Sequence, residues 1–130
     1  MDKNVLIAIA QGSEDIEVAV PVDMLRRAGI TVKVAGETDI ITCSRGLKLI
    51  PDLLLQEIDD DVIFDALIIP GGNEGTYRLT NNEYLFKIIK RHIENGKIIA
   101  AICAGPLVLH DNKFLPATMS LTSHPSVSHI

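Results

Sequence analysis

Cys103 stands at the end of an apolar run and between small residues, a setting in which a thiol can act as a nucleophile. The run 98–102 is typical of a buried strand, and Pro106 marks a helix start, so Cys103 falls at a strand-to-helix turn. The spacing Ala101-x-Cys103-x-Gly105 matches the nucleophile elbow, whose tight turn requires small neighbours. The N–H groups at a helix start favour a thiolate. Taken alone, the pattern also fits a cysteine buried as a small core residue.

The remaining candidate ligands do not form a metal or cofactor motif. Cys43 and Cys103 are the only cysteines, so we expect two free thiols rather than a disulfide framework or a CxxC metal site. The histidines also lack metal-ligand spacing; they are His92, His110, His124 and His129. Neither a G-x-G-x-x-G after the first strand nor a P-loop is present. We therefore expect no metal and no cofactor.

Composition and charge narrow the class of protein. The chain has 130 residues, 47% of them hydrophobic and 22% charged, which predicts one globular domain. It carries 17 acidic against 12 basic residues, and no run of Lys and Arg is longer than two. Nucleic acid is therefore not an expected partner. The first apolar run, Val5 to Ala10, is too short for a signal peptide, and no run reaches a membrane span, so we expect a cytoplasmic protein without membrane contact.

The first predicted helix follows the polar residues after the first strand. We expect Ser13 to be its N-cap, and we expect the helix to run to about Arg27, where Gly29 ends it. Its apolar positions recur with a spacing of four and form one helix face: Ile16, Val20, Met24 and Ala28. Pro21 is expected to kink or restart the helix.

The rest of the chain alternates strands with helical segments. We predict strands at 4–10, 31–35, 66–69 and 98–102, a helix at 82–94 ended by Asn95-Gly96, and a turn at 59–61. The segments 40–43 and 47–50 are predicted to form a hairpin or a short edge excursion. The strands are apolar throughout, which indicates a parallel sheet covered on both faces. We therefore predict a doubly wound α/β fold with a mostly parallel sheet, of flavodoxin-like type. The loops 11–14, 71–72 and 103–104 should meet at the carboxyl ends of its strands, where such folds bind ligands.

The segment 120–125 is predicted to be a strand, and no helix follows it before Ile130. Domains of this class normally cover such a strand with a helix. We therefore expect residues 1–130 to form a single domain that is incomplete at its C-terminus.

Five motifs occur in the order and at the separations found in one family: 14–17 (EDIE), 21–29 (PVDMLRRAG), 70–72 (PGG), 100–106 (AAICAGP) and 122–125 (TSHP). Together they resemble the DJ-1 branch of the DJ-1/ThiJ/PfpI family over the whole chain. The resemblance implies that Cys103 is the reactive cysteine and Glu17 the acid beside it. It also implies that Gly72 and Ala104 supply oxyanion-binding N–H groups and that His124 lies near the cysteine.

The same resemblance implies that Arg27 and Arg45 contact an anion or the dimer interface. Each assignment has a structural alternative. Glu17 could be a helix-capping acid, Gly72 a plain turn, His124 a surface histidine, and the two arginines ordinary surface charges. Where protease-like members carry histidine after the cysteine, this chain has Ala104, so a peptidase would lose its nearest general base.

Three functions follow from these residues. The leading hypothesis is a cofactor-independent cysteine enzyme acting on α-oxoaldehydes such as methylglyoxal, or on the early adducts they form with proteins: a glyoxalase or deglycase. The alternative is a redox sensor or oxidative-stress chaperone that works through oxidation of Cys103. A protease or amidase is the third hypothesis. Family members continue further and often dimerise, so we expect a homodimer, and we expect a C-terminal piece of the same protein as a second partner.

Overall fold

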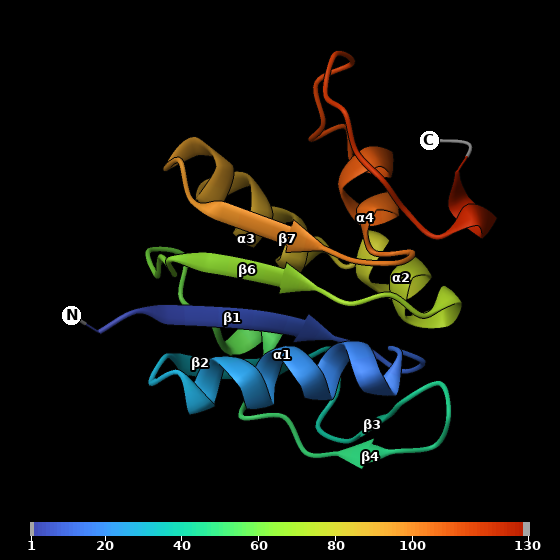
Figure 1. Cartoon of the computed structure of the whole chain (residues 1–130). Coiled ribbons are helices and arrows are strands. Elements are labelled where there is room, and N and C mark those ends of the chain that lie inside the picture. The colour runs from blue at the N-terminus through green and yellow to red at the C-terminus, as the bar shows by residue number, and fades with distance from the viewer. Residues whose placement is uncertain (1, 129–130) are drawn as a thin grey trace.

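A parallel five-stranded sheet forms the centre of the molecule (Figure 1), as a computed structural model of residues 2–128 shows; Met1, His129 and Ile130 lie outside the described residues. Its strand order is β5-β2-β1-β6-β7. The strands are β1 (Asn4–Ile9), β2 (Thr31–Gly36), β5 (Leu53–Leu54), β6 (Ala66–Ile69) and β7 (Ile98–Ala101). Helices lie on both faces, which confirms the predicted fold class.

Successive residues of β1 point to opposite faces of the sheet and contribute to two separate cores. One core contains Ile7 and Ile9 and packs against Val18 of α1 (Asp15–Arg27). The other contains Leu6 and Ala8 and packs against the helices of the opposite face, which are α2 (Asn73–Thr80), α3 (Glu83–Glu94) and α4 (Pro106–Asp111). Because both faces are covered, every position of β1 after Asn4 is buried.

The chain changes direction in the sheet between β1 and β6. From β1 it proceeds to β2 and β5 on one side, and then returns to place β6 and β7 on the other side. At such a point the loops on the carboxyl ends of neighbouring strands diverge and leave room for a ligand. The loops after β1, β6 and β7 meet at this end of the sheet, on the right in Figure 1, as predicted.

Several short-range predictions are confirmed. The strands β3 (Ile41–Thr42) and β4 (Lys48–Leu49) pair antiparallel as the predicted hairpin. Asn82 caps α3 by accepting the N–H of Leu85, and Gly29 follows α1 with a φ of +83°, a conformation that favours glycine. Two 3₁₀ turns complete the described elements, η1 (Leu55–Glu57) and η2 (Pro125–Val127). In residues 2–128, no helix has the length and apolar character needed to cross a membrane.

The prediction that Ser13 caps α1 is wrong. Glu14 is the N-cap: its Oε2 accepts the N–H of Ile16 at 2.8 Å and that of Glu17 at 3.3 Å. The Ser13 hydroxyl is fully buried and accepts the N–H of Ala10 at 3.0 Å. Because the Ser13 hydroxyl is bound to the N–H of Ala10, it is not available to accept an N–H from the first turn of α1. The carboxyl group of Glu14, the next side chain, accepts those N–H groups instead.

The predicted apolar face of α1 is exposed rather than buried. Ile16, Val20 and Met24 are 67%, 52% and 60% exposed, whereas Val18 is buried against the sheet. The helix also continues through Pro21 without a restart. We call the exposed residues Ile16, Val20 and Met24 the α1 stripe.

After β6 the structure differs from the prediction in two places. Helix α2 was not predicted, because its sequence is polar and contains Gly75. That glycine lets α2 approach Ser13, since a Cβ at position 75 would lie 2.6 Å from the Ser13 nitrogen. The strand predicted at 120–125 is absent: this segment runs without regular structure until Pro125 begins η2.

Candidate active site

Cys103 occupies a strained turn between β7 and α4. Its φ is +62°, a left-handed conformation that costs a non-glycine residue about 1–2 kcal/mol. The N–H of Gly105 closes the turn on the carbonyl of Ile102 at 2.8 Å. A Cβ on Gly105 would lie 2.5 Å from the carbonyl oxygen of Ile69, which explains why this position must be glycine. The backbone therefore presents Cys103 as a nucleophile elbow does.

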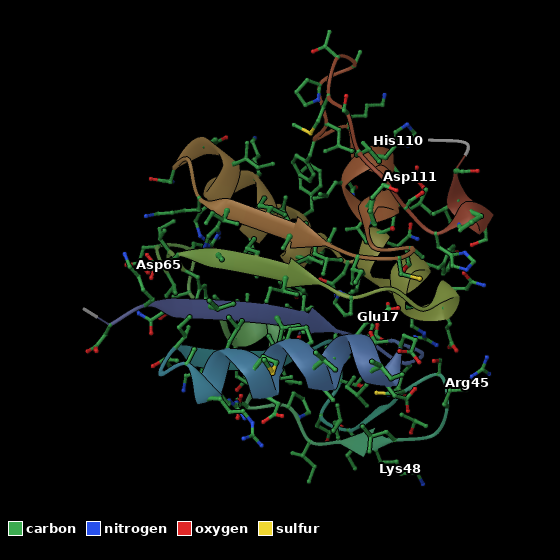
Figure 2. The ribbon with its side chains drawn as sticks, in the orientation of Figure 1. Glu17, Arg45, Lys48, Asp65, His110 and Asp111 are labelled. Carbon is green, nitrogen blue, oxygen red and sulfur yellow. The ribbon has the colours of Figure 1, made fainter. Side chains whose placement is uncertain are left out.

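Glu17 reaches this turn from the first turn of α1, on the other face of the sheet (Figure 2). Its Oε1 accepts the N–H of Gly71 at 2.8 Å, which places its carboxyl group beside Cys103. Gly71 separates the two residues by backbone alone. A Cβ there would lie 2.6 Å from Glu17 Oε1 and 2.9 Å from both the Cβ of Cys103 and the nitrogen of Ala104.

The environment raises the pKa of the Cys103 thiol above its ordinary value of 9.0. Partial burial is the main cause, and the neighbouring Glu17 carboxyl group adds to it. The N–H of Ala104 acts in the opposite direction but does not compensate. The N–H at the helix start thus favours the thiolate, as expected, whereas burial and Glu17 favour the thiol. The Glu17 carboxyl group is placed beside the thiol, where it can take the thiol proton.

A cleft of about 400 Å³ opens over the sulfur. The loops after β1, β6 and β7 line it, together with the hairpin and the C-terminal segment. Gly72 lies at its wall with a φ of +91°, and a Cβ there would collide with the carbonyl oxygen of Gly12. Gly72 and Ala104 both line the cleft beside Cys103, where backbone N–H groups can face an oxyanion.

His124 also lines the cleft, but its backbone makes the contact with the cysteine. The His124 N–H donates to the carbonyl of Cys103 at 2.8 Å. Its Nδ1 accepts the N–H of Ser126 at 3.1 Å and contacts the Ser126 hydroxyl at 2.8 Å. Since Nδ1 accepts from a backbone N–H, the neutral ring carries its proton on Nε2.

The two arginines implied by the resemblance lie apart. Arg45 lies in the hairpin loop (Figure 2) and is one of the residues that line the cleft, whereas Arg27 lies near the far end of α1 and pairs with Asp23 at 2.9 Å. Asp15 holds the hairpin in place, because its Oδ1 accepts the N–H of Arg45 at 2.8 Å and its Oδ2 that of Leu47 at 3.0 Å. Only Arg45 is therefore close enough to contact a ligand at Cys103.

Sequence reasoning missed four residues that shape this site. Gly71 was seen only as part of a turn, and Asp15 and Ser13 were assigned to the start of the helix. Ser126, two residues after His124, was not considered. The adjacent glycines 71 and 72 were the one available signal, because a glycine pair after a buried strand indicates close backbone approach. Within residues 2–128, no group of three His, Cys, Asp or Glu side chains is placed to bind a metal ion.

Comparison with known proteins gives concordant matches. The model of the DJ-1/PfpI family matches residues 3–129. Protein dj-1beta of Drosophila melanogaster is 36% identical over 129 residues, which are 98% of this chain and 68% of the fly protein. The protein described as glutathione-independent glyoxalase DJR-1.2 of Caenorhabditis elegans is 38% identical over 109 residues, or 82% of this chain and 58% of the worm protein.

Solved structures agree with these matches. The structure of oxidized Toxoplasma gondii DJ-1 has a TM-score of 0.90 at 36% sequence identity and covers 95% of this chain and 68% of that one. The chain thus spans between 58% and 68% of the length of these three relatives.

Proposed function

Because the chain belongs to the DJ-1/PfpI family, we propose that it works as a cofactor-independent cysteine enzyme that converts α-oxoaldehydes to 2-hydroxy acids. One observation carries the proposal: the Glu17 carboxyl group and Cys103 are separated only by the backbone of Gly71, beside a cleft at the carboxyl ends of the strands. The name of the worm relative, a glutathione-independent glyoxalase, agrees with this reaction.

The first step joins the sulfur to the aldehyde carbon. As Sγ of Cys103 attacks, the thiol proton passes to the Glu17 carboxylate and from there to the aldehyde oxygen. The product is a hemithioacetal, and Glu17 is again a carboxylate. During the attack, negative charge develops on the aldehyde oxygen, where the N–H groups of Gly72 and Ala104 would stabilise it.

The second step moves hydrogen between neighbouring carbons. The Glu17 carboxylate removes the C–H proton of the hemithioacetal to give an enediolate and returns a proton to the adjacent carbon, while the hydroxyl proton of the former aldehyde carbon passes to the oxygen of the former ketone carbon. The former aldehyde carbon is thereby oxidised to a thioester while the former ketone carbon is reduced to an alcohol. Water then hydrolyses the thioester to the 2-hydroxy acid and restores the Cys103 thiol. One carboxylate beside the sulfur is sufficient for all these proton transfers.

The same chemistry extends to early adducts of α-oxoaldehydes with amines or thiols. Such adducts release their aldehyde reversibly, and the cleft of about 400 Å³ is open enough to admit a side chain that carries one. We therefore include deglycation of these early adducts in the proposal.

The decisive experiment measures lactate formed from methylglyoxal without glutathione or added metal. Cys103→Ala and Glu17→Gln should each lose at least about 100-fold in turnover, since both groups take part in the reaction. Glu74→Gln is the matched control, because Glu74 lines the same cleft but pairs with Arg78 at 3.1 Å. Near-normal turnover in either site variant would refute the proposal.

The redox alternative uses the same thiol and is less well supported. Peroxide oxidises thiolates, and the raised pKa of Cys103 keeps it as a thiol at neutral pH. Its favourable feature is access, because Cys103 is half-buried in the cleft whereas Cys43 is buried. Peroxide titration with mass analysis separates the two functions. Sulfinate formation at Cys103 without methylglyoxal turnover would favour the sensor.

We further propose two protein contacts. The α1 stripe is suited to a second copy of the chain, because exposed apolar side chains on one helix face favour association. An apolar groove of about 550 Å³ runs over β6 and β7 beside the end of α1, and Ile98 is 68% exposed there. A further segment of the same protein would cover this groove. Light scattering should show association of residues 1–130 that Ile98→Lys reduces, and a clean monomer would contradict this second contact.

A further inference from the structure

We propose that Gly71 is a positioning residue that fixes the rotation of the Glu17 carboxyl group. Its N–H holds Oε1 as an acceptor, so that Oε2 is the atom that exchanges protons with Cys103 and with substrate. This inference deepens the proposed function and rests on it for its catalytic meaning.

Gly71 is attached to the start of α1 at two points. Its N–H donates to Glu17 Oε1 at 2.8 Å, and its carbonyl accepts the N–H of Glu14 at 3.0 Å. Glu14 is the N-cap of the same helix, so the Gly71 backbone and the base of the Glu17 side chain move as one unit. The hydrogen bond to Oε1 is therefore a fixed feature of the site rather than a contact of two mobile chains.

A fixed carboxyl rotation matters because the terminal torsion of a glutamate side chain is otherwise soft. An oxygen that accepts a backbone N–H retains its negative character, whereas the other oxygen remains free to take a proton. In the proposed reaction the same carboxyl group takes a proton from sulfur, gives it to the aldehyde oxygen and then removes one from carbon. Holding Oε1 on Gly71 keeps Oε2 directed at the reacting atoms through all three transfers.

Position 71 requires glycine because Glu17 and Cys103 approach its backbone closely, and not because its backbone is left-handed. Its φ lies outside the positive range, and a Cβ would lie 2.6 Å from Glu17 Oε1 and 2.9 Å from Cys103 Cβ. Any side chain at position 71 would therefore separate the acid from the nucleophile.

A pair of substitutions at Glu17 tests the orientation through the thiol alone. In Glu17→Gln, Gly71 can bind only the amide oxygen, so the amide NH₂ takes the place of Oε2 and donates to the sulfur. Glu17→Met is matched in size and has neither charge nor donor. The pH dependence of Cys103 alkylation by iodoacetamide, followed by peptide mass mapping, gives the thiol pKa in each variant.

We expect the pKa of Cys103 in Glu17→Gln to be lower than in Glu17→Met by about one pH unit or more, because a donor to a thiolate stabilises the charged form. An equal or higher pKa in Glu17→Gln would overturn the proposal. The measurement needs no turnover. If the wild type does not convert methylglyoxal, the proposed function fails, and the two pKa values still test the orientation of Glu17. If the wild type converts methylglyoxal but Cys103 has the same pKa in both variants, only the proposed orientation fails.

A second comparison uses Gly71 itself. In Gly71→Ala the new Cβ displaces Glu17, so the pKa of Cys103 should move down toward its ordinary value. Gly36→Ala is the matched control, because a Cβ there would lie 2.7 Å from Pro51 Cγ, equally crowded but at the end of β2. Circular dichroism confirms that both variants fold. An unchanged Cys103 profile in folded Gly71→Ala would contradict the proposal.

Discussion

The backbone N–H of His124 donates a 2.8 Å hydrogen bond to the carbonyl oxygen of Cys103. The segment after α4 is thus joined to the nucleophile turn through main-chain atoms, while the imidazole is bound to Ser126 two residues further on. The side chain at position 124 can therefore be replaced without removing the main-chain hydrogen bond that holds this segment against the turn. The carboxyl group of Glu17, by contrast, is a side-chain group that lies beside Cys103 and accepts the N–H of Gly71.

His124→Ala should reduce turnover of methylglyoxal by about tenfold or less, against the 10²–10⁴-fold typical of losing a general acid or base at Glu17. The reason is that alanine retains the backbone N–H that holds the turn. Steady-state kinetics measures the difference. Ser126→Ala, which removes the hydroxyl partner of the ring, is the control and should have an effect no larger. A loss equal to that of Glu17→Gln would mean that the imidazole itself transfers protons.

Cys103 should be alkylated before Cys43 at every pH at which the protein is folded. Burial raises the pKa of Cys43 to about 11, with the charges of Asp15 and Glu14 adding to the effect, so its thiol stays protonated and inaccessible. The pKa of Cys103 is also raised, so its reaction rate should still be increasing at pH 9.0. Mass mapping after timed exposure to iodoacetamide measures both rates. Modification of Cys43 in the native protein at neutral pH is the result that would contradict this.

The free energy of unfolding should fall as the pH drops below about 6.5. His92 is fully buried and neutral: its Nδ1 donates to the carbonyl of Ile88 at 2.6 Å, and its Nε2 accepts the N–H of Phe64 at 2.7 Å. Burial lowers its pKa below 6.5, so the unfolded chain binds the proton first and stability is lost on acidification.

Urea unfolding between pH 5 and pH 8 measures this slope. His92→Leu should abolish the His92 contribution and cost about 1–3 kcal/mol at neutral pH, because it leaves the buried N–H of Phe64 without an acceptor. His110→Gln is the control at an exposed histidine and should keep the slope. An unchanged slope in His92→Leu would show that another group is responsible.

Association through the α1 stripe should be sensitive to a single charge. Val20→Glu places a carboxylate at the middle of the stripe, and burying it unpaired between two copies would be costly. In an Ile98→Lys background, which removes association through the groove over β6 and β7, size-exclusion chromatography with light scattering should show a dimer that Val20→Glu converts to a monomer. Lys48→Glu, on the exposed face of the hairpin, is a control that also changes charge. Dimers of unchanged affinity in Val20→Glu would locate the contact elsewhere.

Much of this fold is predictable from local sequence because local interactions decide it. Continuous apolar runs identified the main sheet strands, and Gly29 and Asn82 mark helix ends through backbone conformation and capping. The failures occur where distant groups compete. Ser13 reads as a cap, but the N–H of Ala10 takes its hydroxyl. The α1 stripe has the periodicity of a buried face, and spacing alone does not show which face the sheet covers.

Some features of the candidate site can likewise be predicted from local sequence, whereas others depend on residues far apart in the chain. The turn at Cys103 is predictable because its small residues are adjacent in sequence. The resemblance to a family implied Glu17, Gly72 and Ala104, whereas the composition of the chain did not. Gly71 and Asp15 act through backbone hydrogen bonds across 54 and 30 residues, and no local pattern encodes such partners. The raised pKa of Cys103 likewise depends on an acid that belongs to another element.

Ser13 joins three segments that are far apart in the chain. The Ser13 hydroxyl accepts the N–H of Ala10 after β1, and the Ser13 carbonyl accepts the N–H of Ser44 in the hairpin. Gly75 of α2 packs against the Ser13 backbone. These links require long loops to close, which is slow and entropically costly during folding. The cleft should therefore assemble late and open as one cooperative unit, so that amide hydrogens at Ala10, Ser44 and Thr76 exchange with solvent at a common rate.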